Sequence, residues 1–170
     1  CAKIIFNSEW SKKQFLKKLD KFYHKSEKLE VIHQSINKEK VNINKKEKLI
    51  TFVGKLNSAK GYDLFGRAMI KVLDKYPEWK AKVIGDEPRE RYNFSHKRLS
   101  YTGWIPQDKV LNLYNHSSIT VAPSLWEEPF GRSSLEAGSR GNAVIISKRG
   151  GLPENINYIF CFHYRILSIS

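Results

Sequence analysis

The sequence has few of the residues that build disulfide frameworks, metal clusters or membrane spans. Its two cysteines, Cys1 and Cys161, lie near opposite ends without the spacing of metal ligands or of a redox pair, and this usage fits a reducing compartment. No apolar run approaches the roughly 20 residues of a membrane span, and no secretory signal opens the chain. Disulfide-rich, cysteine-metal and transmembrane proteins are therefore not indicated.

The composition is that of a globular protein with a basic surface. Hydrophobic residues make up 41% of the 170 residues and charged residues 28%, which is enough for one full core but not for several complete domains. The net charge of +13 fits an anionic partner such as nucleic acid, acidic lipid or a phosphorylated substrate, and it fits solvated lysine-rich faces equally well. A first residue other than Met suggests a fragment of a longer chain.

Strands and helices alternate from Leu49 to Ser147, which predicts an α/β fold with a Rossmann-like, doubly wound parallel sheet. One expected helix, 62–76, should turn Leu64, Met69, Val72 and Leu73 toward the sheet. The expected strands cover 48–54, 79–84, 99–105, 117–124 and 143–147, and the other expected helices cover 107–117 and 132–141.

A different unit precedes this alternation. We expect a buried strand at 2–8, a helix over 9–23 capped by Ser8, a strand at 29–36 and a polar linker at 37–48. The helix should present one apolar face, which consists of Trp10, Phe15, Leu19 and Phe22. His24 and His33 lack acidic or histidine partners at ligand spacing, so we expect surface or packing histidines.

One stretch, residues 123–154, concentrates the chemistry. A strand feeds the loop WEEPFG, then come a helix, a second strand and the double glycine Gly150-Gly151. The loop follows the carboxyl end of a strand, where open parallel sheets bind ligands. It carries Glu128, and Glu136 follows in the helix. The spacing of two carboxylates alone proves little, but this context makes it specific.

Earlier in the chain, the loop after the first strand of the alternating region carries Lys55 and Lys60 next to Gly61. It is neither a Walker loop nor a GxGxxG fingerprint. The two ammonium groups could converge on a diphosphate at the sheet edge, because paired cations neutralise phosphate without a metal. Solvated lysines in a lysine-rich chain are the alternative that this loop alone leaves open.

Four motifs together resemble the C-terminal, nucleotide-sugar-binding domain of the family 4 (group 1) retaining glycosyltransferases, which have the GT-B fold. They are VGKLNSAKGYD, YTGWIP, PSLWEEPFGRSSLEAGSRGNAVIIS and GGLPE, in the family's order and spacing. The first segment, with AKIIFNSEWSKKQFLKKL and LEVIHQSIN, resembles the end of the N-terminal acceptor domain. The implied division is 1–47 for that remnant and the linker, 48–157 for an incomplete donor domain, and 158–170 for an atypical tail.

The resemblance implies a role for each carboxylate. Glu128 would contact hydroxyls of the donor sugar, and Glu136 would hold the ribose hydroxyls, since a carboxylate can accept hydrogen bonds from a vicinal diol. Phe130 and Gly131 would offer backbone N–H groups, helped by the amino end of the following helix. Gly54, Arg132 and Leu135 complete the implied donor site, with Ile105 and Trp104 where the family receives the base; packing would explain Trp104 equally well.

For the lysines, the resemblance implies that Lys55 and Lys60 stabilise the departing nucleoside diphosphate, so that Lys55, Lys60 and Glu128 form the catalytic set. The family more often has Arg at the first of these positions, and Lys55 supplies a point charge instead of a bidentate fork. Ala143 also stands where the family has Pro, which should matter little. Gly150-Gly151 should make a tight turn near the sugar, and Glu154 should cap the next helix.

The implied reaction transfers a sugar from a nucleoside-diphosphate donor to an acceptor hydroxyl with retention, and it uses neither a metal nor another cofactor. The implied partners are the donor and a glycan, lipid or small-molecule acceptor, with no specific nucleic acid. The implied location is the cytoplasm, with peripheral association at the inner face of the membrane as an option. Because the acceptor domain is incomplete here, we expect this chain to be inactive alone.

Alternatives stay open at this point. A GT-B nucleotide-sugar epimerase shares the fold and the double glycine but has different carboxylate and histidine patterns. A non-catalytic donor-binding fragment would bind nucleotide without turnover, and a basic nucleic-acid module would need an aromatic and basic motif that the sequence lacks. The tail YIFCFHYRILSIS departs from the family pattern, for which truncation or a frameshift is the leading explanation.

Overall fold

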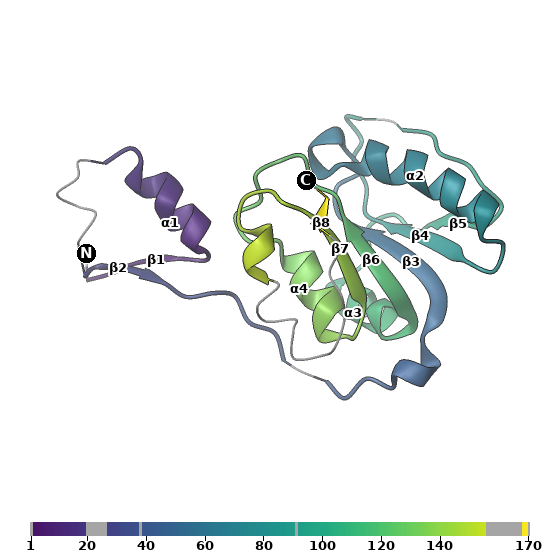
Figure 1. Ribbon diagram of the computed structural model, residues 1–170, viewed down its shortest axis with the longest axis horizontal. Coiled ribbons are helices and arrows are strands. Elements are labelled where there is room, and N and C mark those ends of the chain that lie inside the picture. The colour runs from purple at the N-terminus through teal and green to yellow at the C-terminus, as the bar shows by residue number, and fades with distance from the viewer. Residues whose placement is uncertain (1, 20–26, 38, 91, 156–167, 170) are drawn as a thin grey trace.

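The computed structural model describes residues 2–19, 27–37, 39–90, 92–155 and 168–169. Its centre is a parallel sheet of order β5-β4-β3-β6-β7-β8 (Figure 1). The strands are β3 (Glu47–Val53), β4 (Lys80–Ile84), β5 (Leu99–Tyr101), β6 (Ser117–Ala122), β7 (Ala143–Ser147) and the two-residue β8 (Ser168–Ile169). The predicted α/β fold with a Rossmann-like parallel sheet is confirmed.

Helices cover both faces because the crossovers leave β3 in opposite directions along the sheet. Helix α2 (Tyr62–Lys75) joins β3 to β4, whereas α4 (Arg132–Ser139) joins β6 to β7. Helix α3 (Gln107–His116) precedes β6 and packs with α4. The predicted doubly wound arrangement therefore holds across the described strands.

The core has two parts, one on each face of the sheet. Phe65 and Met69 of α2 pack on Phe52 of β3, while Val110 of α3 and Val144 of β7 belong to the other part. Alternation along the strands produces this division, since neighbouring side chains point to opposite faces. The prediction that Leu64 faces the sheet is wrong: it is 39% exposed, and Phe65 takes the inward place.

The N-terminal unit consists of β1 (Ile4–Phe6), α1 (Glu9–Leu16) and β2 (Leu29–Val31), with β1 and β2 paired in parallel. Ser8 caps α1 as predicted, because its side chain accepts a hydrogen bond from Ser11 N. The predicted burial of the first strand is wrong, since Ile5 is 60% exposed. The predicted apolar face of α1 contains no buried residue, but its Phe15 ring packs against Phe6 with centroids 5.2 Å apart.

Several predictions fall partly outside the described residues. The helix expected over 9–23 ends at Leu16, and positions 20–26, which include Phe22 and His24, are not described. The tail expected at 158–170 is described only at β8. Of the linker at 37–48, a short 3-10 turn forms at Ile43–Lys45 and β3 begins at Glu47. The domain limits remain predictions.

Lys46 connects this linker to the ends of two helices. Its ammonium group donates to Tyr114 O at 2.7 Å and to Arg140 O at 2.6 Å, near the carboxyl ends of α3 and α4. A cation there interacts favourably with both helix dipoles. Burial nevertheless lowers the pKa of Lys46 from 10.5 to about 8, because it penalises the charged form.

This pKa predicts a stability that rises with pH. Between pH 8 and 10 the unfolded chain binds more protons at Lys46 than the folded chain, so the free energy of unfolding should increase with pH. The slope stays below about 1.4 kcal/mol per pH unit, because one proton is the limit and partial exposure reduces it further. Urea unfolding at pH 7.5 and 9.5 measures this contribution as the free energy of unfolding of wild type minus that of Lys46→Met, which should be larger at pH 9.5. A difference that falls with pH would show that the two carbonyl contacts outweigh desolvation.

Candidate functional site

The lysine loop after β3 and the glutamate loop after β6 meet at one edge of the sheet. We call residues 54–61 the lysine loop and residues 123–131 the glutamate loop. The N–H groups of Leu125 and Trp126 donate to Ala59 O at 3.0 and 2.9 Å. Gly61 has φ +68°, and a Cβ there would overlap the carbonyl of Pro123. Only glycine allows this close approach.

Lys60 and Glu128, two of the predicted catalytic residues, form an ion pair between these loops. The Lys60 side chain is 35% exposed and that of Glu128 only 12%. Asn57 caps the short 3-10 helix at Ser58–Lys60, and Ser124 Oγ donates to Glu128 Oε1 at 3.2 Å. Each loop therefore orients its own charged residue, and the charges neutralise each other.

A cleft of about 440 Å³ lies at the carboxyl ends of β3 and β4, and neither Lys60 nor Glu128 is among the described residues that line it. Four of the predicted residues line it: Gly54, Lys55, Ile105 and Glu136. Lys55 is exposed, and among the described residues its side chain has no hydrogen-bond or ion-pair partner. The other lining residues are Val53, Ile84, Gly85, Asp86, Trp104, Gln107 and Val110.

Glu136 is the buried anion of the cleft, with 7% of its surface exposed. Gln107 Nε2 donates to its Oε1 at 2.6 Å, and Arg132 Nε donates to the same oxygen at 2.9 Å. Within the described part of the chain, Oε2 accepts no hydrogen bond, so it is available to a ligand. Burial, and then the charge of Glu136, raises the pKa of Tyr114 well above its ordinary value.

The backbone at Phe130–Gly131 is held from behind by Asn155. Its Nδ2 donates to Phe130 O at 2.5 Å and to Gly131 O at 2.8 Å. Gly131 has φ +87° at the amino end of α4. Phe130 and Leu135 have buried side chains, and neither is among the described residues that line the cleft.

Sequence reasoning missed three residues that orient this site: Gln107, Ser124 and Asn155. Each acts through one hydrogen bond or a few to a residue far along the chain or to loop backbone, and no spacing marks such contacts. For Trp104 the sequence allows packing or base recognition. Its side chain is 71% exposed, so it does not pack into the core of the described residues.

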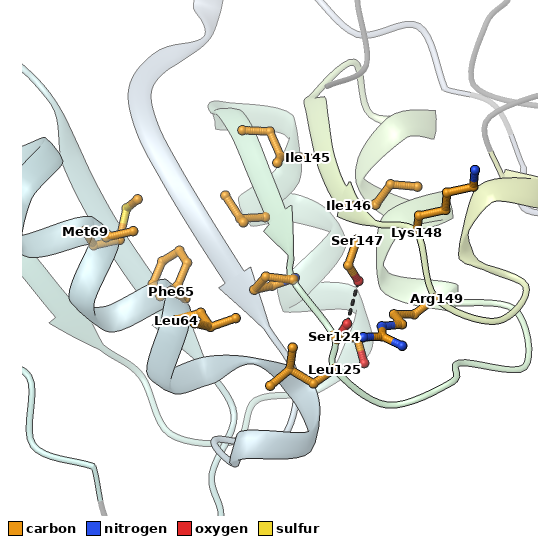
Figure 2. Close-up of a pocket in the computed structure, with 13 residues that line it drawn as sticks. Leu64, Phe65, Met69, Ser124, Leu125, Ile145, Ile146, Ser147, Lys148 and Arg149 are labelled. Atoms are coloured by element: carbon orange, nitrogen blue, oxygen red, sulfur yellow. Dashed lines mark hydrogen bonds between the residues drawn. The ribbon is translucent and has the colours of Figure 1, made fainter. Parts of the chain in front are cut away.

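A larger, apolar pocket of about 580 Å³ lies between α2 and the strands β6 and β7 (Figure 2). Leu64, Met69 and Ile145 contribute to its walls, and Ser147 Oγ donates to Ser124 O at 2.6 Å. It contains none of the predicted site residues. The cleft with the converging charges is therefore the better candidate, although it is smaller.

Among the described residues, no group of three or more His, Cys, Asp or Glu side chains is placed to hold a metal ion. A search of the same residues found no helix with the length and apolarity to cross a membrane.

Comparison with known proteins places the chain in a family. The family model for glycosyl transferases group 1 matches residues 33–158. A glycosyltransferase of Methanocaldococcus jannaschii is 31% identical over 156 residues, which is 78% of this chain and 39% of that protein. The chain thus spans well under half the length of this curated relative.

Two solved structures extend the comparison. The C-terminal domain of a group 1 family protein, LpcC, from Francisella tularensis is 31% identical, with a TM-score of 0.55, covering 64% of this chain and 63% of that one. The Anabaena protein HepE, solved with UDP and glucose, is 19% identical with a TM-score of 0.69, covering 91% of this chain and 46% of that one. At 19% identity, the likeness to HepE is one of fold alone.

Proposed function

This chain belongs to the group 1 glycosyl transferases, and on that basis we propose that it binds the nucleoside-diphosphate-sugar donor of a retaining, metal-independent family 4 transfer reaction. The observation that carries the proposal is the convergence of Lys55, Lys60, Glu128 and Glu136 at one sheet edge, around and beside a cleft. Two cations suit the diphosphate, and two carboxylates suit the hydroxyls of the sugar and the ribose on either side of it.

Each part of the donor then has its partner. The free Oε2 of Glu136 accepts from the ribose diol, while Gln107 and Arg132 hold the other oxygen. Lys55 and Lys60 neutralise the diphosphate, and the N–H groups of Phe130 and Gly131 add donors at the start of α4.

Binding should also release Glu128. In the structure Lys60 and Glu128 satisfy each other. A diphosphate that attracts Lys60 leaves Glu128 free to accept from sugar hydroxyls, so one ion pair is exchanged for two ligand contacts. Lys60 then stabilises the charge that develops on the leaving phosphate.

The acceptor in this proposal is a glycan, a lipid or a small molecule, met in the cytoplasm or at the inner face of a membrane. Because the chain spans 39% of its archaeal relative, donor binding without turnover is what we expect of the 170 residues alone. In a longer chain, a transferred sugar rather than an epimerised donor distinguishes transferase from epimerase.

A thermal-shift screen tests the proposal with UDP, GDP, ADP and their sugar conjugates. One nucleotide at 100 times its Kd should stabilise the fold by about 2.7 kcal/mol. Glu136→Gln should weaken binding of the ribonucleotide about tenfold and change binding of the 2′,3′-dideoxy nucleotide little. The reason is that only the ribose diol donates hydrogen bonds to the carboxylate. Glu78→Gln, which removes an exposed carboxylate paired with Lys48, is the control. Stabilisation by DNA or RNA but by no nucleotide would contradict donor binding.

A further inference from the structure

The turn at Leu152–Asn155 (η4) lies between the N-terminal unit and the glutamate loop. It follows the double glycine directly. Two consecutive residues of the turn, Glu154 and Asn155, contact different parts of the molecule. Asn155 holds the loop backbone at Phe130 and Gly131, as described above. Glu154 reaches the start of α1.

Glu154 caps α1 from a distant part of the chain. Its carboxylate accepts from the N–H of Glu9 at 2.7 Å and from that of Trp10 at 2.8 Å. These are two of the N–H groups that a helix start leaves unpaired, and an anion there is favoured by the helix dipole. Glu154 thus caps a helix that precedes it by 144 positions at Trp10, while the following helix that it is predicted to cap would lie outside the described residues.

His33 binds the same carboxylate. Its Nε2 lies 2.9 Å from Glu154 Oε2, and its ring packs against Phe130 with centroids 5.7 Å apart. The acidic partner lies 121 positions away, which is not ligand spacing, and the contact with Phe130 fits the expected packing histidine. The end of the N-terminal unit thus touches both the turn and the glutamate loop.

Ser8 completes the contact on the loop itself. Its hydroxyl donates to Pro129 O at 2.5 Å, one residue after Glu128. The double glycine packs against the same loop: Gly151 N donates to Glu128 O at 2.6 Å, and Gly150 N donates to the Glu127 carboxylate at 2.6 Å. The backbone around Glu128 is therefore held from the N-terminal unit and from the turn together.

We propose that Glu154 is a positioning residue that fastens the start of α1 against the glutamate loop and so fixes Glu128 in place. The inference rests on the proposed role of Glu128 in binding the donor sugar. It adds that the N-terminal unit is part of the donor site, through Ser8 and His33, although none of the residues described in that unit lines the cleft.

Amide hydrogen exchange on the 170-residue chain tests the proposal without any ligand. In Glu154→Ala, exchange should accelerate about tenfold at Glu9 and Trp10, which lose their acceptor, and severalfold at Gly151, whose N–H reports the anchoring of Glu128. Glu154→Gln, which keeps one acceptor oxygen, should lie between. Ser8→Ala should accelerate Gly151 as well. Glu30→Gln, an exposed carboxylate of β2 paired with Lys3, is the matched control.

Exchange that accelerates at Glu9 and Trp10 but not at Gly151 in Glu154→Ala and Ser8→Ala would reduce Glu154 to a helix cap and overturn the proposal. Circular dichroism and the melting temperature establish that each variant is folded.

A binding measurement separates this proposal from the proposed function. With the nucleotide from the thermal-shift screen, Glu154→Ala should weaken the sugar conjugate about tenfold more than the bare diphosphate, because only the sugar depends on Glu128. Equal weakening of both would contradict the positioning role. If no nucleotide binds the wild type, the proposed function fails, while the exchange result still decides whether Glu154 fastens the loop.

Discussion

Lys60→Met should weaken binding of the nucleoside diphosphate by about 30-fold or more, because a charge-assisted contact to phosphate is worth about 2–3 kcal/mol. The variant keeps the length of the side chain but loses the charge. It also leaves Glu128, only 12% exposed, without its cation. The unpaired carboxylate then repels an approaching diphosphate. Isothermal titration calorimetry on the 170-residue chain measures the change.

Lys71→Met is the matched control for this experiment. Lys71 is exposed on α2, away from the glutamate loop, and the substitution removes the same unit of charge. If the two variants lose equal affinity, the effect is one of net charge, and the assignment of Lys60 to the diphosphate is wrong. The double variant Lys60→Met with Glu128→Gln should recover stability relative to Lys60→Met, since the unpaired buried carboxylate is removed.

Gly150→Ala should lower the free energy of unfolding by about 2–5 kcal/mol, because two costs combine. Gly150 has φ +57°, which an L-residue adopts with strain, and a Cβ there would overlap the backbone of Glu128, with the nitrogen at 2.7 Å. Backbone cannot yield as a side-chain tip can. We therefore also expect the variant to lose the extra affinity for a sugar conjugate over the bare diphosphate.

Gly103→Ala separates the two costs. Gly103 has φ +69°, but a Cβ there meets nothing within 4 Å, so the variant carries the strain without the clash. Urea unfolding should place Gly103→Ala about 1–2 kcal/mol below wild type and Gly150→Ala clearly lower. Equal losses in the two variants would show that the loop around Glu128 adapts to the added methyl.

Local pattern was enough to predict the sheet and the meeting of the two charged loops. The strands from β3 to β7 and the helices between them follow from alternating apolar runs and glycine turns, because these signals act within a few residues. Parallel strands also bring their carboxyl ends to one edge, which is why the loops carrying Lys60 and Glu128 could be expected to meet. The roles of individual site residues remain predictions.

Long-range partners could not be predicted in this way. Nothing near Glu154 in the sequence indicates that its carboxylate pairs with His33 and the start of α1, because such contacts depend on how the units pack. The prediction that Leu64 faces the sheet failed for a related reason. The helix period allows either Leu64 or Phe65 to face the sheet, and the aromatic side chain fills the space against Phe52. Burial of β1 was inferred from its apolar residues, but apolar side chains on a two-stranded sheet remain exposed unless something covers them.

The position of β3 bears on how the chain acquires its structure during synthesis. β3 is the first strand of the large sheet to be made, yet it ends between β4 and β6. Its edge toward β4 is paired once Lys80–Ile84 is available, whereas Ile50 must wait for Ile119 on the other side. Until then a hydrophobic strand presents an open edge, which is a site for pairing with other chains. The nascent half-sheet, up to the emergence of β6, is therefore the stage at which this edge is open to pairing with other chains.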